Sequence, residues 1–167
     1  YGETVSLSNF LGKTIILEWT NHDCPFVARH YKTGNMQETQ EFGRKEGAVW
    51  LTIISSAPGT QGYVLSEKAN QLTYTRNASP NHVLFDPEGT VGLMYGAKTT
   101  PHMYIIDSSG FLRYQGAIDN AGGRGFKYRD LSKATNYVKE ALKEISLKKS
   151  LTNKTTGPYG CSVKYKI

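Results

Sequence analysis

Cys24 is the residue of this sequence with the clearest capacity for chemistry. It precedes Pro25, and residues 25–31 are predicted to form a helix because proline is favoured in a first helical turn. A cysteine at a helix N-terminus faces unpaired backbone N–H groups and the positive end of the helix dipole, which stabilise the thiolate. Because the thiolate is the nucleophile, this position predicts a reactive Cys24. The alternative is an inert cysteine that packs as a small apolar residue.

Three charged or titratable neighbours and one distant thiol bear on this site. His22 and His30 are close to Cys24 in sequence and are expected to add positive charge, whereas Asp23 opposes thiolate formation. Cys161 lies near the end of the chain in a Gly/Pro-flanked stretch. A sulfenic acid or mixed disulfide needs a second thiol for its release, so Cys161 is a candidate resolving cysteine. It could equally be an incidental thiol in the tail.

Hydrophobic periodicity predicts the elements that must position these residues. Buried strands are expected at 14–20, 48–55 and 81–86, a hairpin at 102–115, and helices at 25–31, 36–45, 66–77 and 132–145. Ser66 and Ser132 are expected helix N-caps, and residues 122–125 are expected to form a flexible loop. This order predicts an α/β fold with a central mixed sheet flanked by helices. One domain is expected over residues 1–146, followed by a flexible tail over 147–167 that carries Cys161.

Four segments carry a family resemblance. They are EWTNHDCPFV at 18–27, Thr99-Thr100-Pro101, the hairpin segment 105–113, and the closing YGCSVKY. Together they resemble the redoxin branch of the thioredoxin-like superfamily over residues 1–145. That branch includes the alkyl hydroperoxide reductase/thiol-specific antioxidant proteins and the periplasmic thiol–disulfide reductases. The resemblance implies a thioredoxin-like fold.

The resemblance also implies roles for particular residues. Glu18 is six residues before Cys24, where thioredoxins carry a buried acid that shuttles protons; a strand acid paired with a lysine is the alternative. Thr100 and Pro101 match the loop that presents a cis-proline and lines the groove for an extended thiol substrate. The implied site therefore comprises catalytic Cys24, Cys161 and Glu18, and substrate-binding Trp19, Pro25, Thr100 and Pro101.

The sequence departs from both standard sites of this superfamily. Val27 occupies the position of the second cysteine of a CxxC pair. Leu17 and Asn21 stand where peroxiredoxins have proline and threonine, and Pro101 stands where they have an arginine that polarises the peroxide. We therefore expect a thiol oxidoreductase that acts on disulfides or peroxides. The alternatives are a peroxiredoxin-like thiol peroxidase and a non-catalytic binding module that holds a metal through Cys24 and the histidines.

Composition limits the partners. Of the 20 Lys and Arg residues behind the net charge of +6, ten lie in residues 127–167, where they indicate a solvated basic face rather than a nucleic-acid site. No apolar run is long enough for membrane insertion. The expected partners are a thiol reductant, either a thioredoxin-like protein or a small thiol, and a protein disulfide or peroxide substrate. No cofactor or metal is expected. We expect a monomer or homodimer, in the periplasm or cytoplasm of a bacterium.

Overall fold

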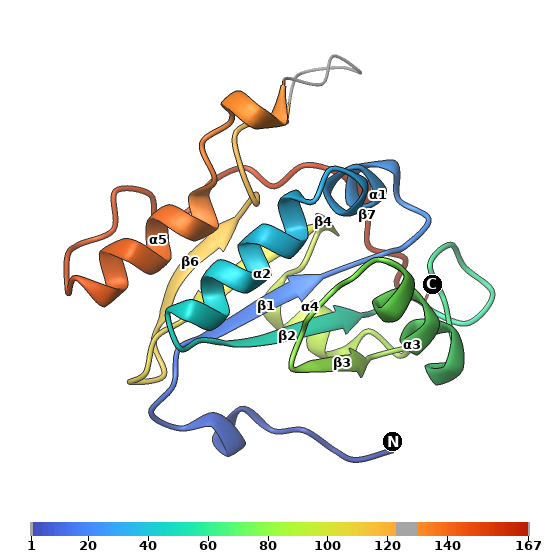
Figure 1. Ribbon diagram of the computed structural model, residues 1–167. Coiled ribbons are helices and arrows are strands. Elements are labelled where there is room, and N and C mark those ends of the chain that lie inside the picture. The colour runs from blue at the N-terminus through green and yellow to red at the C-terminus, as the bar shows by residue number, and fades with distance from the viewer. Residues whose placement is uncertain (1, 123–129, 167) are drawn as a thin grey trace.

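A five-stranded mixed sheet forms the centre of the computed structural model, which describes residues 2–122 and 130–166 (Figure 1). The strand order is β3-β2-β1-β5-β6. The strands are β1 (Ile15–Trp19), β2 (Val49–Ile54), β3 (His82–Phe85), β5 (His102–Ile106) and β6 (Leu112–Gly116). β2 runs parallel to β1 and β3, whereas β5 runs antiparallel to β1 and β6. The predicted α/β fold with a mixed sheet is confirmed.

Alternation along the strands creates two apolar layers. On one face, Ile16, Trp50 and Ile105 pack against buried side chains of α1 (Pro25–Lys32), α2 (Asn35–Lys45) and α5 (Tyr137–Ser146). Figure 1 shows α2 and α5 in contact across this face. The other face packs against η1 (Leu7–Phe10) and α4 (Thr90–Tyr95). Helix α3 (Ser66–Thr75) packs at the β3 side of the sheet.

Two predicted helix caps are wrong, although the helices exist. Leu65 is the N-cap of α3 and Ser66 is already its first helical residue. Ser132 lies in a short 3-10 helix, η2 (Leu131–Lys133), that is capped by Asp130. Extended backbone at Ala134 then separates η2 from α5, whose N-cap is Asn136. Several residues in this stretch have side chains suited to capping, and the sequence does not show which of them the tertiary packing uses. Most of the predicted 122–125 loop lies outside the described residues.

The segment after α5 is bound along its length to the rest of the domain. The Thr156 N–H donates to the Gln115 carbonyl of β6 at 3.1 Å. Further on, the two-residue strand β7 (Cys161–Ser162) pairs antiparallel with β4 (Thr99–Thr100), in the stretch directly before Pro101. The last residues then approach the loop after β2, where Ala57 donates to the Lys164 carbonyl at 2.8 Å. This path brings β7 beside β4 and near α1, where Figure 1 labels it. None of the helices in the described ranges has the length and apolar character needed to cross a bilayer.

His102 is a buried histidine at the start of β5, directly after Pro101. Only 5% of its surface is exposed. Its Nδ1 accepts the Lys98 backbone N–H at 3.2 Å and lies 3.2 Å from the Tyr104 hydroxyl. Burial, assisted by the charge of Lys98, lowers the pKa of His102 to about 4. The folded protein therefore holds this side chain neutral under conditions in which the unfolded chain would protonate it.

This difference predicts a pH dependence of stability. Between about pH 6.5 and pH 4 the unfolded chain binds a proton at His102 that the folded chain does not, so the free energy of unfolding should fall as the pH falls. In His102→Asn, whose side-chain oxygen can still accept the Lys98 N–H, this fall should shrink by up to about 3 kcal/mol. Urea denaturation at a series of pH values measures it, with His82→Asn at an exposed histidine as the control. An unchanged pH slope in His102→Asn would contradict the prediction.

Candidate active site

Cys24 lies between the end of β1 and the beginning of α1. It is the N-cap of α1, with extended backbone (φ −74°, ψ 122°), and Pro25 is the first helical residue. Its carbonyl accepts the Ala28 N–H at 2.9 Å, the first bond of the helix. The predicted helix N-terminus is therefore present at the cysteine. The Cys24 side chain is fully buried, so its sulfur depends on protein groups rather than on solvent for its hydrogen bonds.

Two distant segments meet at the Cys24 sulfur. The thiol donates to the Thr100 carbonyl oxygen, with Sγ and O 3.2 Å apart, and the Cys161 backbone N–H donates to Sγ at 3.4 Å. Thr100 and Cys161 are directly paired in the β4–β7 ladder, and the Thr100–Pro101 peptide bond is cis. The structure thus brings together four of the implied site residues: Cys24, Thr100, Pro101 and Cys161.

The electrostatic environment distinguishes the two thiols. Burial raises the pKa of Cys24, but hydrogen bonds from the Cys161 thiol, from the Val27 N–H and from the Cys161 N–H outweigh it, so the net pKa is lowered. Burial raises the pKa of Cys161 to about 12, and the hydrogen bond and negative charge of Cys24 act in the same direction. Cys24 is therefore the thiol that ionises first, while Cys161 keeps its proton and donates it to the Cys24 sulfur.

Glu18 is buried in a separate polar cluster. Its carboxylate accepts hydrogen bonds from the Tyr31 hydroxyl at 2.8 Å, Trp50 Nε1 at 2.9 Å, the Thr52 hydroxyl at 3.0 Å and Gln40 Nε2 at 3.5 Å. Burial raises its pKa, and these hydrogen bonds offset the rise only in part. Among the described residues its hydrogen-bond partners are these four donors, none of them a lysine and none the Cys24 thiol. The Glu18 carboxylate and the Cys24 sulfur therefore have different hydrogen-bond partners among the described residues.

Trp19 lies on the other face of β1 from Glu18. Its indole N–H donates to the Ser55 hydroxyl at 3.0 Å, and its ring contacts Tyr95 and Tyr104 at centroid distances of 5.4 and 5.1 Å. The residue is fully buried within the second apolar layer. The structure therefore places Trp19 in the core, apart from the four residues that meet at the sulfur.

The two histidines near Cys24 in sequence make other contacts. His22 Nε2 lies 3.2 Å from an Asp23 carboxylate oxygen, and His30 faces the buried carboxylate of Asp119. Burial lowers the pKa of both histidines, against the opposing effect of each carboxylate. Neither is therefore the source of positive charge expected from the sequence. Within the described ranges, no three His, Cys, Asp or Glu side chains are grouped as metal ligands.

Sequence reasoning missed a polar cluster beside the site. Asp119, Tyr159 and Asn35 surround the buried His30, and Tyr159 is two residues before Cys161. No short motif links these positions because they come from four separate segments. Their residue types alone gave no signal, since single Asp, Tyr and Asn residues are common on protein surfaces.

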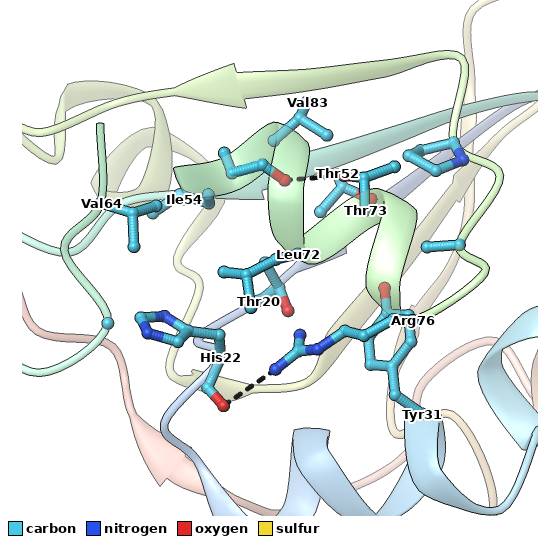
Figure 2. A pocket seen from close by; sticks show the side chains of 14 residues that line it. Thr20, His22, Tyr31, Thr52, Ile54, Val64, Leu72, Thr73, Arg76 and Val83 are labelled. Carbon is cyan, nitrogen blue, oxygen red and sulfur yellow. Dashed lines mark hydrogen bonds between the residues drawn. The ribbon is translucent and has the colours of Figure 1, made fainter. Parts of the chain in front are cut away.

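A small cavity of about 40 Å³ lies between the ends of β1 and β2 and the helix α3. Figure 2 shows Thr20, His22 and Arg76 around it, with the Arg76 guanidinium donating to the His22 carbonyl at 3.1 Å. The Thr20 hydroxyl is buried and has no hydrogen-bond partner among the described residues. Tyr31 and Thr52, two donors to Glu18, also line the cavity. A polar site of this size has room for water.

Comparisons with known proteins agree with the fold described above. The model of the AhpC/TSA family matches residues 1–115. A hypothetical protein from Sinorhizobium meliloti is 19% identical, with a TM-score of 0.81 over 99% of this chain and 87% of that one. An uncharacterized conserved protein from Geobacillus kaustophilus is 19% identical, with a TM-score of 0.83 over 99% and 84%. A secreted disulfide oxidoreductase from Mycobacterium tuberculosis is 13% identical, with a TM-score of 0.50 over 65% and 72%. No curated protein sequence matches the chain.

The hydrogen bond from Cys161 predicts how the acidity of Cys24 responds to substitution. Cys161→Ala removes the thiol donor but keeps the backbone N–H, so the pKa of Cys24 should rise, by about one unit for one lost hydrogen bond. Cys161→Ser keeps a hydroxyl donor at this position and should leave the pKa of Cys24 below that in the alanine variant. The pH dependence of iodoacetamide alkylation, with Cys24 the single remaining thiol, measures both values. Equal pKa values in the two variants would show that the side chain at 161 does not stabilise the thiolate.

Proposed function

Because the chain belongs to the AhpC/TSA family of thiol oxidoreductases, we propose that it works through a two-cysteine cycle in which Cys24 attacks the substrate and Cys161 resolves the product. The observation that carries this proposal is the contact between the two residues. The Cys161 N–H donates to the Cys24 sulfur at 3.4 Å, and the Cys161 thiol is hydrogen-bonded to the same atom. A second thiol at this position is placed for disulfide formation without a large rearrangement of the chain.

The first step is attack by the Cys24 thiolate. With a disulfide, the thiolate forms a new S–S bond, the substrate S–S bond breaks, and one substrate sulfur leaves with the electron pair and takes up a proton. With a peroxide, the thiolate attacks one oxygen, the O–O bond breaks, and the other oxygen leaves with the electron pair and is protonated; Cys24 becomes a sulfenic acid. Either product carries no negative charge on the Cys24 sulfur.

The second step is attack by Cys161 on the oxidised Cys24 sulfur. The negative charge that helped to raise the pKa of Cys161 has disappeared at this stage, so the second thiol becomes easier to ionise. Its attack forms the Cys24–Cys161 disulfide and releases a substrate thiol or, from the sulfenic acid, water; the proton of Cys161 goes to that leaving group. An external reductant, either a dithiol protein or two small thiols, then reduces the disulfide by two further exchanges.

Other implied residues take supporting parts in this proposal. The backbone at Thr100 and Pro101 aligns the substrate, because it already lies against the Cys24 sulfur. Pro25 fixes the backbone of the first turn of α1, so that the N-terminus of the helix stays at the Cys24 sulfur. For Glu18 we propose proton exchange through water: burial raises its pKa, and the cavity beside its partners Tyr31 and Thr52 has room for a water molecule.

The geometry favours disulfides over peroxides as substrates. Pro101 has no donor to offer a peroxide oxygen. The Asn21 side chain donates to Gln61 at 3.3 Å and accepts the Asp23 N–H at 3.0 Å, so its donor and its acceptor both have partners. The backbone of β4 beside the sulfur, by contrast, can pair with an extended disulfide substrate in the place that β7 takes in this structure.

Oxidation followed by mass spectrometry tests the cycle. After mild treatment with hydroxyethyl disulfide or hydrogen peroxide, the wild-type protein should lose two hydrogens and yield a peptide pair joined through Cys24 and Cys161. Cys161→Ser should stop at a Cys24 adduct or sulfenic acid. Cys24→Ser should react through Cys161 far more slowly than the wild type reacts through Cys24, because burial, the largest cause of the raised pKa of Cys161, remains in that variant. Accumulation of over-oxidised Cys24 in the wild type, without the internal disulfide, would contradict the resolving role of Cys161.

Relative rates test the substrate class. The second-order rate constant of reduced wild-type protein with a peptide disulfide should exceed that with hydrogen peroxide, because no side-chain donor polarises the O–O bond at positions 21 and 101. Stopped-flow tryptophan fluorescence measures both reactions, since Trp19 and Trp50 lie in the two apolar layers of the sheet. The Cys24→Ser variant controls for reactions elsewhere. A peroxide rate constant above that of the disulfide would identify a thiol peroxidase instead.

A further inference from the structure

The C-terminal segment around Cys161 occupies the backbone edge beside the Cys24 sulfur. Cys161 is paired with Thr100, the Thr100 hydroxyl donates to the Cys161 carbonyl at 3.4 Å, and the Val163 N–H donates to the Lys98 carbonyl at 3.1 Å. The sulfur of Cys24 beneath this segment is fully buried. The segment therefore both presents Cys161 and covers Cys24, so whatever holds it in place controls both thiols.

The side chain of Tyr159 anchors this segment to the domain. Its hydroxyl donates to the carboxylate of Asp119 and lies 3.0 Å from His30 Nε2. Asn35 donates to His30 Nδ1 at 2.8 Å, which leaves Nε2 as the protonated nitrogen that donates to the tyrosine oxygen. The ring of Tyr159 also packs edge-on against Phe26 in α1, with centroids 5.8 Å apart. One hydroxyl thus connects the tail to α1 and to the chain after β6.

Apart from the contacts to Tyr159, the polar groups of this cluster are hydrogen-bonded within the domain. Asp119 is 2% exposed, and its carboxylate also accepts the Ala121 N–H at 3.0 Å and an Asn35 amide N–H at 3.3 Å. His30 is 1% exposed and comes from the helix that begins at Cys24. The cluster therefore has a place for one hydroxyl group between His30 Nε2 and the Asp119 carboxylate, and Tyr159 supplies that group from the tail.

Gly160 allows the close approach that follows the anchor. A Cβ built at this position would lie 2.0 Å from the Thr100 carbonyl oxygen, a backbone atom that has no freedom to move aside. Its φ of 140° is also strained for any residue with a side chain. At Gly157, three residues earlier, a built Cβ would have no atom within 4 Å, and the backbone φ lies outside the strained range. The short distance between β7 and β4 therefore requires glycine at 160 but not at 157.

We propose that Tyr159 is a positioning residue of the two-cysteine cycle, because its hydroxyl, seated between Asp119 and His30, holds the tail in the place where Cys161 meets and covers Cys24. This inference rests on the proposed role of Cys161. It goes further in that access of any external reagent to Cys24 requires release of the Tyr159 hydroxyl. The same release moves Cys161 away from Cys24. A change that weakens the Tyr159 anchor should therefore raise the rate at which external reagents reach Cys24 and lower the rate at which the internal disulfide forms.

Alkylation of Cys24 in a Cys161→Ser background tests the anchor without the second thiol. Adding Tyr159→Phe should accelerate reaction with iodoacetamide at high pH by about tenfold or more, the effect of losing one hydrogen bond to a carboxylate. The pH profile should also shift upward, because the N–H at position 161 no longer stabilises the thiolate. Tyr74→Phe, at a tyrosine that is 84% exposed, is the matched control and should change neither quantity. A profile of Tyr159→Phe that coincides with that of its parent would overturn the proposal.

A second pair of variants keeps the test decisive if Tyr159→Phe folds poorly. Gly160→Ala should accelerate alkylation in the same background, whereas Gly157→Ala should not, although both add one methyl group to the same tail. Equal effects of the two substitutions would overturn the close-approach argument. Urea denaturation of each variant confirms that the folded state is fully populated under the conditions of alkylation.

A third measurement, with both cysteines present, separates this inference from the proposed function. After reaction with hydroxyethyl disulfide, Tyr159→Phe should convert the Cys24 mixed disulfide into the internal disulfide more slowly than the wild type or Tyr74→Phe. If the wild type forms no internal disulfide, the resolving role of Cys161 fails, while the alkylation results still decide whether Tyr159 anchors the tail. If the internal disulfide forms at the same rate in all three proteins, the positioning role fails and the cycle stands.

Discussion

A buried sulfur that must ionise is the constraint on which the rest of this site depends. Removing a thiolate from water is costly, and among the described residues it is hydrogen-bond donors that offset that cost. The Val27 N–H comes from the first turn of α1, whereas the Cys161 N–H and thiol come from the far end of the chain. Pro25 is the first residue of α1, so the N-terminus of this helix lies at Cys24. The pairing of β7 with β4 holds the tail beside the Cys24 sulfur. Each of these features serves to bring donors to a single atom.

Two buried carboxylates connect the elements around this atom without touching it. Glu18 links β1 to β2, α1 and α2 through four donors. Asp119 links the chain after β6 to α1, to α2 through Asn35, and to the tail through Tyr159. A buried carboxylate is tolerated when its oxygens are fully hydrogen-bonded. Glu18 thus contributes to the position of α1, and Asp119 contributes to the position of the tail, which also contacts α1 through Tyr159. The sulfur lies where these two arrangements meet.

The same geometry explains why the chain departs from the better-known sites of its superfamily. With Val27 in α1 there is no second thiol in the same helical turn as Cys24, and the thiol that lies beside it, Cys161, comes from a long return of the chain along β6 and β4. With Pro101 in place of a cationic residue, the group opposite the sulfur is a backbone carbonyl. Backbone groups align an extended chain by strand pairing and recognise no particular side chain. In the proposed cycle this arrangement supports exchange between thiols and disulfides, and substrate choice depends on what can replace the tail at β4.

The sequence by itself determined the elements and the position of the candidate nucleophile. Apolar runs and proline or glycine breaks are local signals, and they placed β1, α1, α2 and the β5–β6 hairpin within a few residues of their observed bounds. The cysteine at the start of α1 followed from the same local rules. Tertiary structure alone decided that His22 and His30 would be neutral and would contact other partners. It also decided that Trp19 would lie on the opposite face of the sheet. The contact between Asp119 and Tyr159 that anchors the tail likewise comes from tertiary structure. These outcomes depend on contacts between segments far apart in the chain, where burial and hydrogen-bond partners set the charge and position of each side chain. The acidity of Cys24 depends on both local sequence and tertiary structure. Its position at the start of α1 follows from the local sequence, whereas the hydrogen bonds from Cys161 form only because the fold brings the tail back to that sulfur.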